Sequence, residues 1–232
     1  MNPCERIFVA IDTTDAGQAA ELAASLAGHV GGIKLGKEFF TANGPEGIRR
    51  VTAGGAPLFL DLKYHDIPNT VAGAVRAALA LQPTMLTVHA VGGVAMMRAA
   101  AEAAAEAGDA MPLVLAITVL TSLAETDLPG IGIISPLPDQ VVRLGRLAQK
   151  SRMDGVVCSA KEIMALRSVC GPDFKLVVPG IRPAGATNED QKRVVTPVEA
   201  IALGADYLVI GRPITKANDP VAAVQKIAGE LS

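Results

Sequence analysis

The segment 61–66, Asp-Leu-Lys-Tyr-His-Asp, carries three charged side chains within six residues. In an extended strand, residues i and i+2 share a face, so Asp61 and Lys63 are predicted to point the same way and Leu62 to point away. A second ammonium group, Lys34, lies in a neighbouring apolar run. A lysine held between carboxylates stays charged, which makes it a poor nucleophile but a well-placed proton donor. A purely structural ion-pair network is the alternative interpretation.

A second group of polar residues follows two later apolar runs. The stretch 179–193 is rich in Gly and polar side chains and contains Arg182 and Gln191, and a later turn begins with Gly211 and Arg212. A guanidinium group binds phosphate through two hydrogen bonds, and glycine lets the backbone approach a ligand closely. These residues predict a phosphate site, under a loop long enough to close over a ligand. An ordinary solvated connection is the alternative.

Both groups need a scaffold that brings distant parts of the chain together. Short apolar runs rich in β-branched residues alternate with longer, Ala-rich amphipathic stretches, which is the pattern of strand–helix units. The predicted strands are 6–11, 32–36, 58–63, 85–89, 113–118, 155–158, 175–178 and 207–210. The predicted helices are 15–27, 44–53, one opened by Pro68, 94–107, 138–150, 160–169, 197–203 and 220–231.

Eight such units predict an α/β protein with a parallel sheet closed as a (β/α)8 TIM barrel, in a single domain over residues 1–232. An open, doubly wound sheet is the alternative, but residues 12–15 read Asp-Thr-Thr-Asp where that fold needs a Gly-rich turn. Barrel enzymes place their chemistry at the carboxyl ends of the strands. The residues predicted at or near those ends are Asp12, Lys34, Asp61, Lys63, Asp66, Thr121, Arg182 and Arg212.

The composition excludes several classes of protein. The chain has 21 Lys and Arg against 23 Asp and Glu, so it has no basic excess for nucleic acid or an anionic membrane surface. With 3% aromatic residues and no Trp, a stacking surface for single-stranded nucleic acid is not expected. Three scattered cysteines do not form the pattern of a zinc site. No apolar run reaches about 18 residues and no signal-peptide pattern is present, so we expect no membrane span and a cytoplasmic location.

The chain resembles the orotidine 5′-phosphate decarboxylases, in their bacterial form, along its whole length. The matching stretches are VAID (9–12), IKLGKEFF (33–40), LFLDLKYHDIPNT (58–70), VLTS (119–122), DGVVCSA (154–160), VVPGIRP (177–183), DQKR (190–193) and GADYLVIGRPIT (204–215). The third stretch is highly specific. The resemblance implies a lyase that converts orotidine 5′-phosphate to uridine 5′-phosphate (UMP) and CO2, the last step of de novo pyrimidine synthesis, with no metal and no organic cofactor.

The resemblance also implies a role for each residue of the charged segment. The expected catalytic charge array is Lys34, Asp61, Lys63 and Asp66. Lys63 would protonate C6 of the pyrimidine as CO2 leaves, and Asp61 would lie against the departing carboxylate. Asp66 and Thr70 would reach into the site of a partner subunit, so the active unit would be a homodimer.

The remaining contacts implied by the resemblance hold the rest of the nucleotide. Asp12 and Lys34 would bind ribose hydroxyls, Ser122 would contact the pyrimidine, and Thr121 would lie beside it. The residues expected at the phosphate are Arg182, Gln191, Gly211 and Arg212, and Pro179 is a further expected substrate contact. Loss of CO2 leaves a carbanion with no adjacent carbonyl to delocalise it, and a fixed ammonium stabilises that charge.

Two other functions are left open by the residues. A Mg²⁺-dependent sugar-phosphate decarboxylase or aldolase of the same superfamily shares Asp-x-Lys-x-x-Asp, but has a carboxylate at the position of Lys34, where a cation would repel the metal. A non-catalytic nucleotide-binding barrel has no reason to pack two lysines and two aspartates together at a high cost of desolvation.

Overall fold

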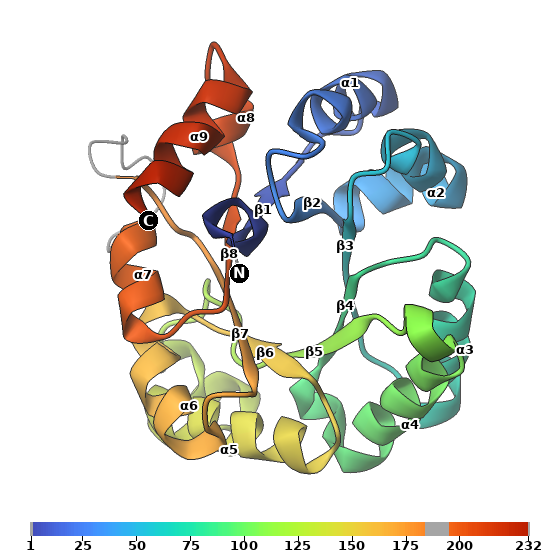
Figure 1. The fold of residues 1–232 in the computed structure, drawn as a ribbon. Helices are drawn as coiled ribbons and strands as arrows, with labels where there is room; N and C mark the ends of the chain where they lie inside the picture. Colours follow the sequence, from blue (N-terminus) through green and yellow to red (C-terminus); the bar gives the residue numbers. More distant parts are fainter. Residues whose placement is uncertain (1, 184–194, 232) are drawn as a thin grey trace.

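The described part of the chain, residues 2–183 and 195–231 of this computed structural model, forms one closed barrel of eight parallel strands (Figure 1). The strands are β1 Ile7–Ala10, β2 Gly32–Gly36, β3 Leu58–Tyr64, β4 Met85–His89, β5 Leu113–Ile117, β6 Gly155–Val157, β7 Lys175–Pro179 and β8 Tyr207–Ile210. Each strand pairs with the next, and β1 pairs with β8, with Ile7 opposite Leu208. This closure confirms the predicted TIM barrel and excludes an open sheet.

The helices surround the barrel as an outer ring (Figure 1). Their bounds are α1 Ala16–Leu26, α2 Lys37–Thr52, α3 Pro68–Leu79, α4 Gly93–Ala105, α5 Leu137–Lys150, α6 Ile163–Cys170, α7 Pro197–Leu203, α8 Arg212–Thr215 and α9 Pro220–Glu230. Apolar side chains on the inner faces of these helices pack against the outward-facing residues of the strands. Among the described helices, none is long and apolar enough to cross a bilayer.

Two helical segments differ from the prediction. The helix predicted over 44–53 begins at Lys37 and kinks at Gly44, which has φ 59° and precedes Pro45. The Gly-Pro pair is typical of a helix start, but Phe39 is 1% exposed and anchors an earlier stretch of helix. The short helix α8 was not predicted and occupies the turn after β8. The other predicted ends lie within about three residues of the observed ones.

A separate cluster of apolar side chains fills the interior of the barrel. The ring of Phe8 packs edge-on against Phe59 and Tyr207, with centroid distances of 6.0 and 5.7 Å. A side chain at Gly32 would collide with this cluster, because an added Cβ would lie 2.6 Å from the Phe8 ring. Three of the chain's seven Phe and Tyr rings therefore pack inside the barrel, in a cluster separate from the core between strands and helices.

Arg167 ties together two connections at the amino ends of the strands. Its Nη2 lies 2.7 Å from Asp206 Oδ2, and Asp206 also accepts a hydrogen bond from the backbone of Leu176. The guanidinium donates further hydrogen bonds to the carbonyl oxygens of Gly171, Pro172, Phe174 and Gly204. Because the side chains of Arg167 and Asp206 are 21% and 19% exposed, this network is a stabilising feature of the fold.

Replacing Arg167 by Met should lower the free energy of unfolding by about 2–4 kcal/mol, because Asp206 and the four carbonyls lose a charged donor. Urea denaturation measures the change. The matched control is Arg49→Met, since the Arg49–Glu46 pair is 54% and 88% exposed and should contribute less than about 0.5 kcal/mol. Equal, small effects of both substitutions would contradict the assignment.

Candidate active site

Asp61 and Lys63 are in direct contact at the carboxyl end of β3. The Lys63 Nζ lies 2.6 Å from Asp61 Oδ2, and the two side chains are 26% and 12% exposed. The backbone is not that of a regular strand, because Lys63 has φ 52° and the pairing with β4 shifts register between Leu60 and Tyr64. Residues other than glycine rarely adopt such a conformation, and strain of this kind gathers at functional sites. The expected contact is present, but an irregular backbone produces it.

Thr87 on β4 holds this irregular segment, although it was not among the predicted site residues. Its hydroxyl accepts a hydrogen bond from the Lys63 backbone N–H and donates one to Asp61 Oδ1, both at 2.9 Å. The residue is fully buried. The signal in the sequence is a hydroxyl within the otherwise apolar run Met85 to Val88, because a buried polar group requires partners. Thr87 therefore positions both members of the Asp61–Lys63 pair.

Lys34 extends the pair into a row of alternating charges. Its Nζ lies 3.4 Å from Asp12 Oδ1 and 3.9 Å from Asp61 Oδ2. The row therefore runs Asp12, Lys34, Asp61, Lys63, from the ends of three neighbouring strands. The Lys34 side chain is only 13% exposed, so its two carboxylate neighbours offset the desolvation of its ammonium.

A cavity of about 250 Å³ opens beside this row of charges. Lys34, Asp61 and Lys63 line it, and so do two further predicted residues, Thr121 and Pro179. The other lining residues are Phe59, Ile117, Val119, Leu120, Val157, Cys158 and Val209. Burial raises the pKa of the Cys158 thiol well above its ordinary value, so this side chain is uncharged. A lining that combines a few charged side chains with many apolar ones suits a flat ligand with one anionic substituent.

Three predicted residues lie outside this arrangement. Asp66 is exposed, and its carboxylate accepts a hydrogen bond from the backbone N–H of Ile67, not from a lysine. Thr70, in the first turn of α3, is also exposed. Ser122 follows the cavity residue Thr121, but is exposed and does not line the cavity. One chain therefore assembles three of the four residues of the expected charge array.

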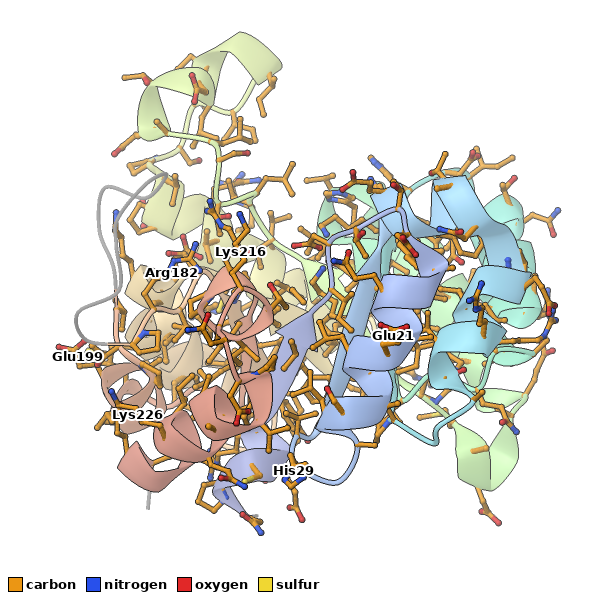
Figure 2. All side chains as sticks on the ribbon, turned by 90° about the horizontal axis from the view of Figure 1, so that it is seen from above. Glu21, His29, Arg182, Glu199, Lys216 and Lys226 are labelled. Carbon is orange, nitrogen blue, oxygen red and sulfur yellow. The ribbon has the colours of Figure 1, made fainter. Side chains whose placement is uncertain are left out.

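Arg182, which is expected at the phosphate, lies at the carboxyl end of β7. Figure 2 shows it at the same end of the barrel as Lys216, and His29 at the opposite end. Arg182 follows β7 directly, is partly buried, and its backbone N–H bonds to the carbonyl of Val195 at 3.3 Å. The sequence predicts Arg182 at the carboxyl ends of the strands, and the structure places it there.

Gly211 lies next to the row of charges. It follows β8, and a Cβ added to it would lie 4.0 Å from Asp12 Oδ2. This predicted phosphate residue is thus a neighbour of the carboxylate expected to bind ribose, and Arg212 follows it as the first residue of α8. Gln191 lies outside the described residues.

His89 ends β4 beside the charge array. Its ring centroid lies 5.5 Å from that of His65. Burial, as the largest cause, and the positive charges of His65, Lys37 and Lys63 together lower the pKa of His89 to about 4, while Asp61 acts in the opposite direction. His89 is therefore a neutral neighbour of the site at pH 7.

Fold and site together define a TIM barrel that holds a lysine–aspartate array beside a cavity at the carboxyl ends of its strands, the arrangement of a barrel enzyme. The model of the orotidine 5′-phosphate decarboxylase / HUMPS family matches residues 5–227. The chain belongs to this family.

Several relatives of the chain carry the name orotidine 5′-phosphate decarboxylase. It is 59% identical to orotidine 5′-phosphate decarboxylase of Rhodospirillum rubrum, over 97% of this chain and 93% of the relative. It is 56% identical to the protein of that name from Paramagnetospirillum magneticum, over 97% of each. The crystal structure of orotidine 5′-phosphate decarboxylase from Lactobacillus acidophilus is similar, with a TM-score of 0.87, 37% identity, and 97% and 98% of the two chains covered.

Thr87→Val should reduce the turnover number of the enzyme about 10- to 100-fold, because the nearly isosteric side chain leaves the Lys63 N–H and Asp61 Oδ1 without their partner. Thr87→Ser keeps the hydroxyl and should retain most of the activity. Steady-state kinetics of the two variants measure the difference. Equal activity of the Val and Ser variants would show that the hydroxyl does not position the pair.

Proposed function

We propose that this chain decarboxylates orotidine 5′-phosphate to UMP and CO2, the last step of de novo pyrimidine synthesis. The observation that carries the proposal is the Lys63–Asp61 contact, at 2.6 Å, on the wall of a cavity at the carboxyl ends of the strands. Relatives that are 59% and 56% identical over nearly the whole chain bear the name of this activity. A cytoplasmic location is part of the same proposal.

Lys63 and Asp61 divide the chemical step between them. As the bond to the carboxylate breaks, its electron pair stays on C6, CO2 departs, and the Lys63 ammonium transfers its proton to C6. Before that transfer the ammonium stabilises the developing carbanion. It is already held in place by Asp61, while Thr87 fixes the backbone of Lys63. Asp61 lies against the substrate carboxylate and favours its conversion to neutral CO2.

The other residues bind and orient the nucleotide. Asp12 and Lys34 hold the ribose hydroxyls, which is compatible with their contact at the mouth of the site. The pyrimidine lies against Thr121, Ser122 and Pro179. The phosphate is bound by Arg182, Gln191, Gly211 and Arg212. Binding energy from the phosphate then holds the reacting ring in place against Lys63 and Asp61.

This reaction needs neither a metal nor an organic cofactor. Lys34 favours a reaction without a metal and argues against a Mg²⁺-dependent sugar-phosphate lyase. Its Nζ lies 3.4 Å from a carboxylate oxygen of Asp12 and 3.9 Å from one of Asp61. A divalent cation bound by those two carboxylates would meet a fixed positive charge. The same packed charges argue against a non-catalytic nucleotide-binding barrel, which would gain nothing from them.

The active unit is proposed to be a homodimer in which Asp66 and Thr70 complete the site of the partner subunit. Both residues are exposed in one chain and make no contact with its own lysines among the described residues. Apolar side chains nearby are exposed as well, with Ile67 at 65% and Val91 at 50%. A surface that combines exposed apolar residues with an exposed carboxylate suits a subunit interface.

The purified protein should decarboxylate orotidine 5′-phosphate in the presence of EDTA, followed as loss of orotate absorbance. Lys63→Ala should lower turnover at least about 10³-fold, because both the proton donor and the fixed positive charge are lost, while UMP still binds. Inactivity of the native chain, or loss of its activity on chelation, would refute the proposal. Turnover retained by the Lys63→Ala variant would refute the assignment of the proton donor.

The shared site can be tested by mixing inactive variants. In a 1:1 mixture of Lys63→Ala and Asp66→Asn chains, half of the dimers should be mixed, and each mixed dimer has one intact site. The mixture should therefore regain about one quarter of the native specific activity if subunits exchange freely. The matched control mixes Lys63→Ala with Lys34→Ala, whose changes lie in each chain's own site, so no activity should return. Failure of the first mixture, with subunit exchange verified by differently tagged chains, would exclude the shared site.

A further inference from the structure

A second cavity, of about 360 Å³, adjoins the charge array at the mouth of the barrel. Its charged lining consists of three carboxylates, Asp12, Glu38 and Asp61, and three ammonium groups, Lys34, Lys37 and Lys63. Lys34 and Lys63 each lie within 4.0 Å of a carboxylate. Of the three ammonium groups, Lys37 is the one that has no role in the proposed chemistry.

The position of Lys37 is unfavourable for the stability of its helix. It is the first residue of α2, where the helix dipole disfavours a cation, and its side chain is exposed. Among the described residues, no carboxylate lies within ion-pairing distance of its ammonium. Residues that break a local rule without a compensating contact tend to serve function.

The charge of Lys37 acts across the mouth of the site. Lys37 lines the same cavity as Lys34, Asp61 and Lys63 of the array. His89, at the end of β4, responds to that charge: after burial, the positive charges of His65 and Lys37 are the larger causes that lower the pKa of His89, ahead of Lys63. The charge of Lys37 therefore acts on the mouth of the barrel as well as on the outer solvent.

We infer that Lys37 is a steering residue that draws the anionic substrate into the mouth of the barrel. Without it, the cavity would present three carboxylates against two ammonium groups to a ligand that carries a carboxylate and a phosphate. A single charge close to the entrance changes the association rate of a multiply charged ligand, and the effect falls with ionic strength. That the substrate is orotidine 5′-phosphate rests on the proposed function. That Lys37 attracts a nucleotide anion does not depend on the reaction which follows.

The test compares three single substitutions at low and high salt. Lys37→Gln should lower kcat/KM about three- to tenfold at about 10 mM salt, with kcat unchanged, and the loss should vanish at about 0.5 M salt. Glu38→Gln, which removes a carboxylate from the same cavity, should raise kcat/KM. Lys226→Gln is the matched control, because Figure 2 shows Lys226 on α9, well away from the end that carries Arg182 and Lys216.

Two further measurements separate steering from other roles. Thermal unfolding of Lys37→Gln should give a Tm equal to or above that of the native chain, since an unfavourable helix-end charge is removed. Calorimetric titration with UMP should show weaker binding to Lys37→Gln at low salt alone. This titration also decides the inference if the native chain fails to decarboxylate orotidine 5′-phosphate, an outcome that would refute only the proposed function.

Three results would overturn the inference. A fall in kcat as large as the fall in kcat/KM would place Lys37 in the chemical step. A loss that persists at high salt would indicate a direct contact instead of a long-range field. An equal loss in Lys226→Gln would show that the total charge of the protein, and not the position of Lys37, controls association.

Discussion

The ion pair between Lys63 and Asp61 is the interaction on which the mouth of this barrel depends. Two opposite charges at the end of a buried strand are costly to desolvate unless every partner is in place. Thr87 bonds to both residues, Lys34 adds a second ammonium near Asp61, and the backbone at Lys63 takes a rare left-handed conformation to permit the contact. A fixed charge of this kind can act on a reacting atom without first reorganising its surroundings.

The two ends of the barrel have different physical tasks. At the amino ends, rings such as Phe8 and Tyr207 fill the interior, and the Arg167 network joins neighbouring connections. At the carboxyl ends, polar and charged side chains surround cavities. Because of this separation, residues at the amino ends stabilise the fold, while the charged residues at the carboxyl ends are available for chemistry.

The charged groups at the mouth of one chain are balanced in number. Asp12, Lys34, Asp61 and Lys63 alternate in sign, and Lys37 and Glu38 add one charge of each sign at the entrance. Among the described residues, Asp66 is exposed and forms no ion pair with a lysine, which is why a shared site between subunits accompanies the proposed activity. An anionic nucleotide then enters a mouth where the balance of a few charges controls both binding and chemistry.

The sequence by itself determined the eight strand–helix units and the closed barrel, because hydrophobic periodicity is a local property of the chain. It also determined which stretch, 58–70, carries the specific motif of the family, since such a motif is local as well. Only the tertiary structure decided which groups meet. Thr87 contacts Asp61 because β4 lies beside β3. Lys63 contacts Asp61 where the pairing of β3 with β4 shifts register, and a regular alternation of inward and outward side chains does not predict such a shift. The start of α2 at Lys37 likewise depends on the burial of Phe39. These contacts link residues on different elements, so local propensity cannot encode them.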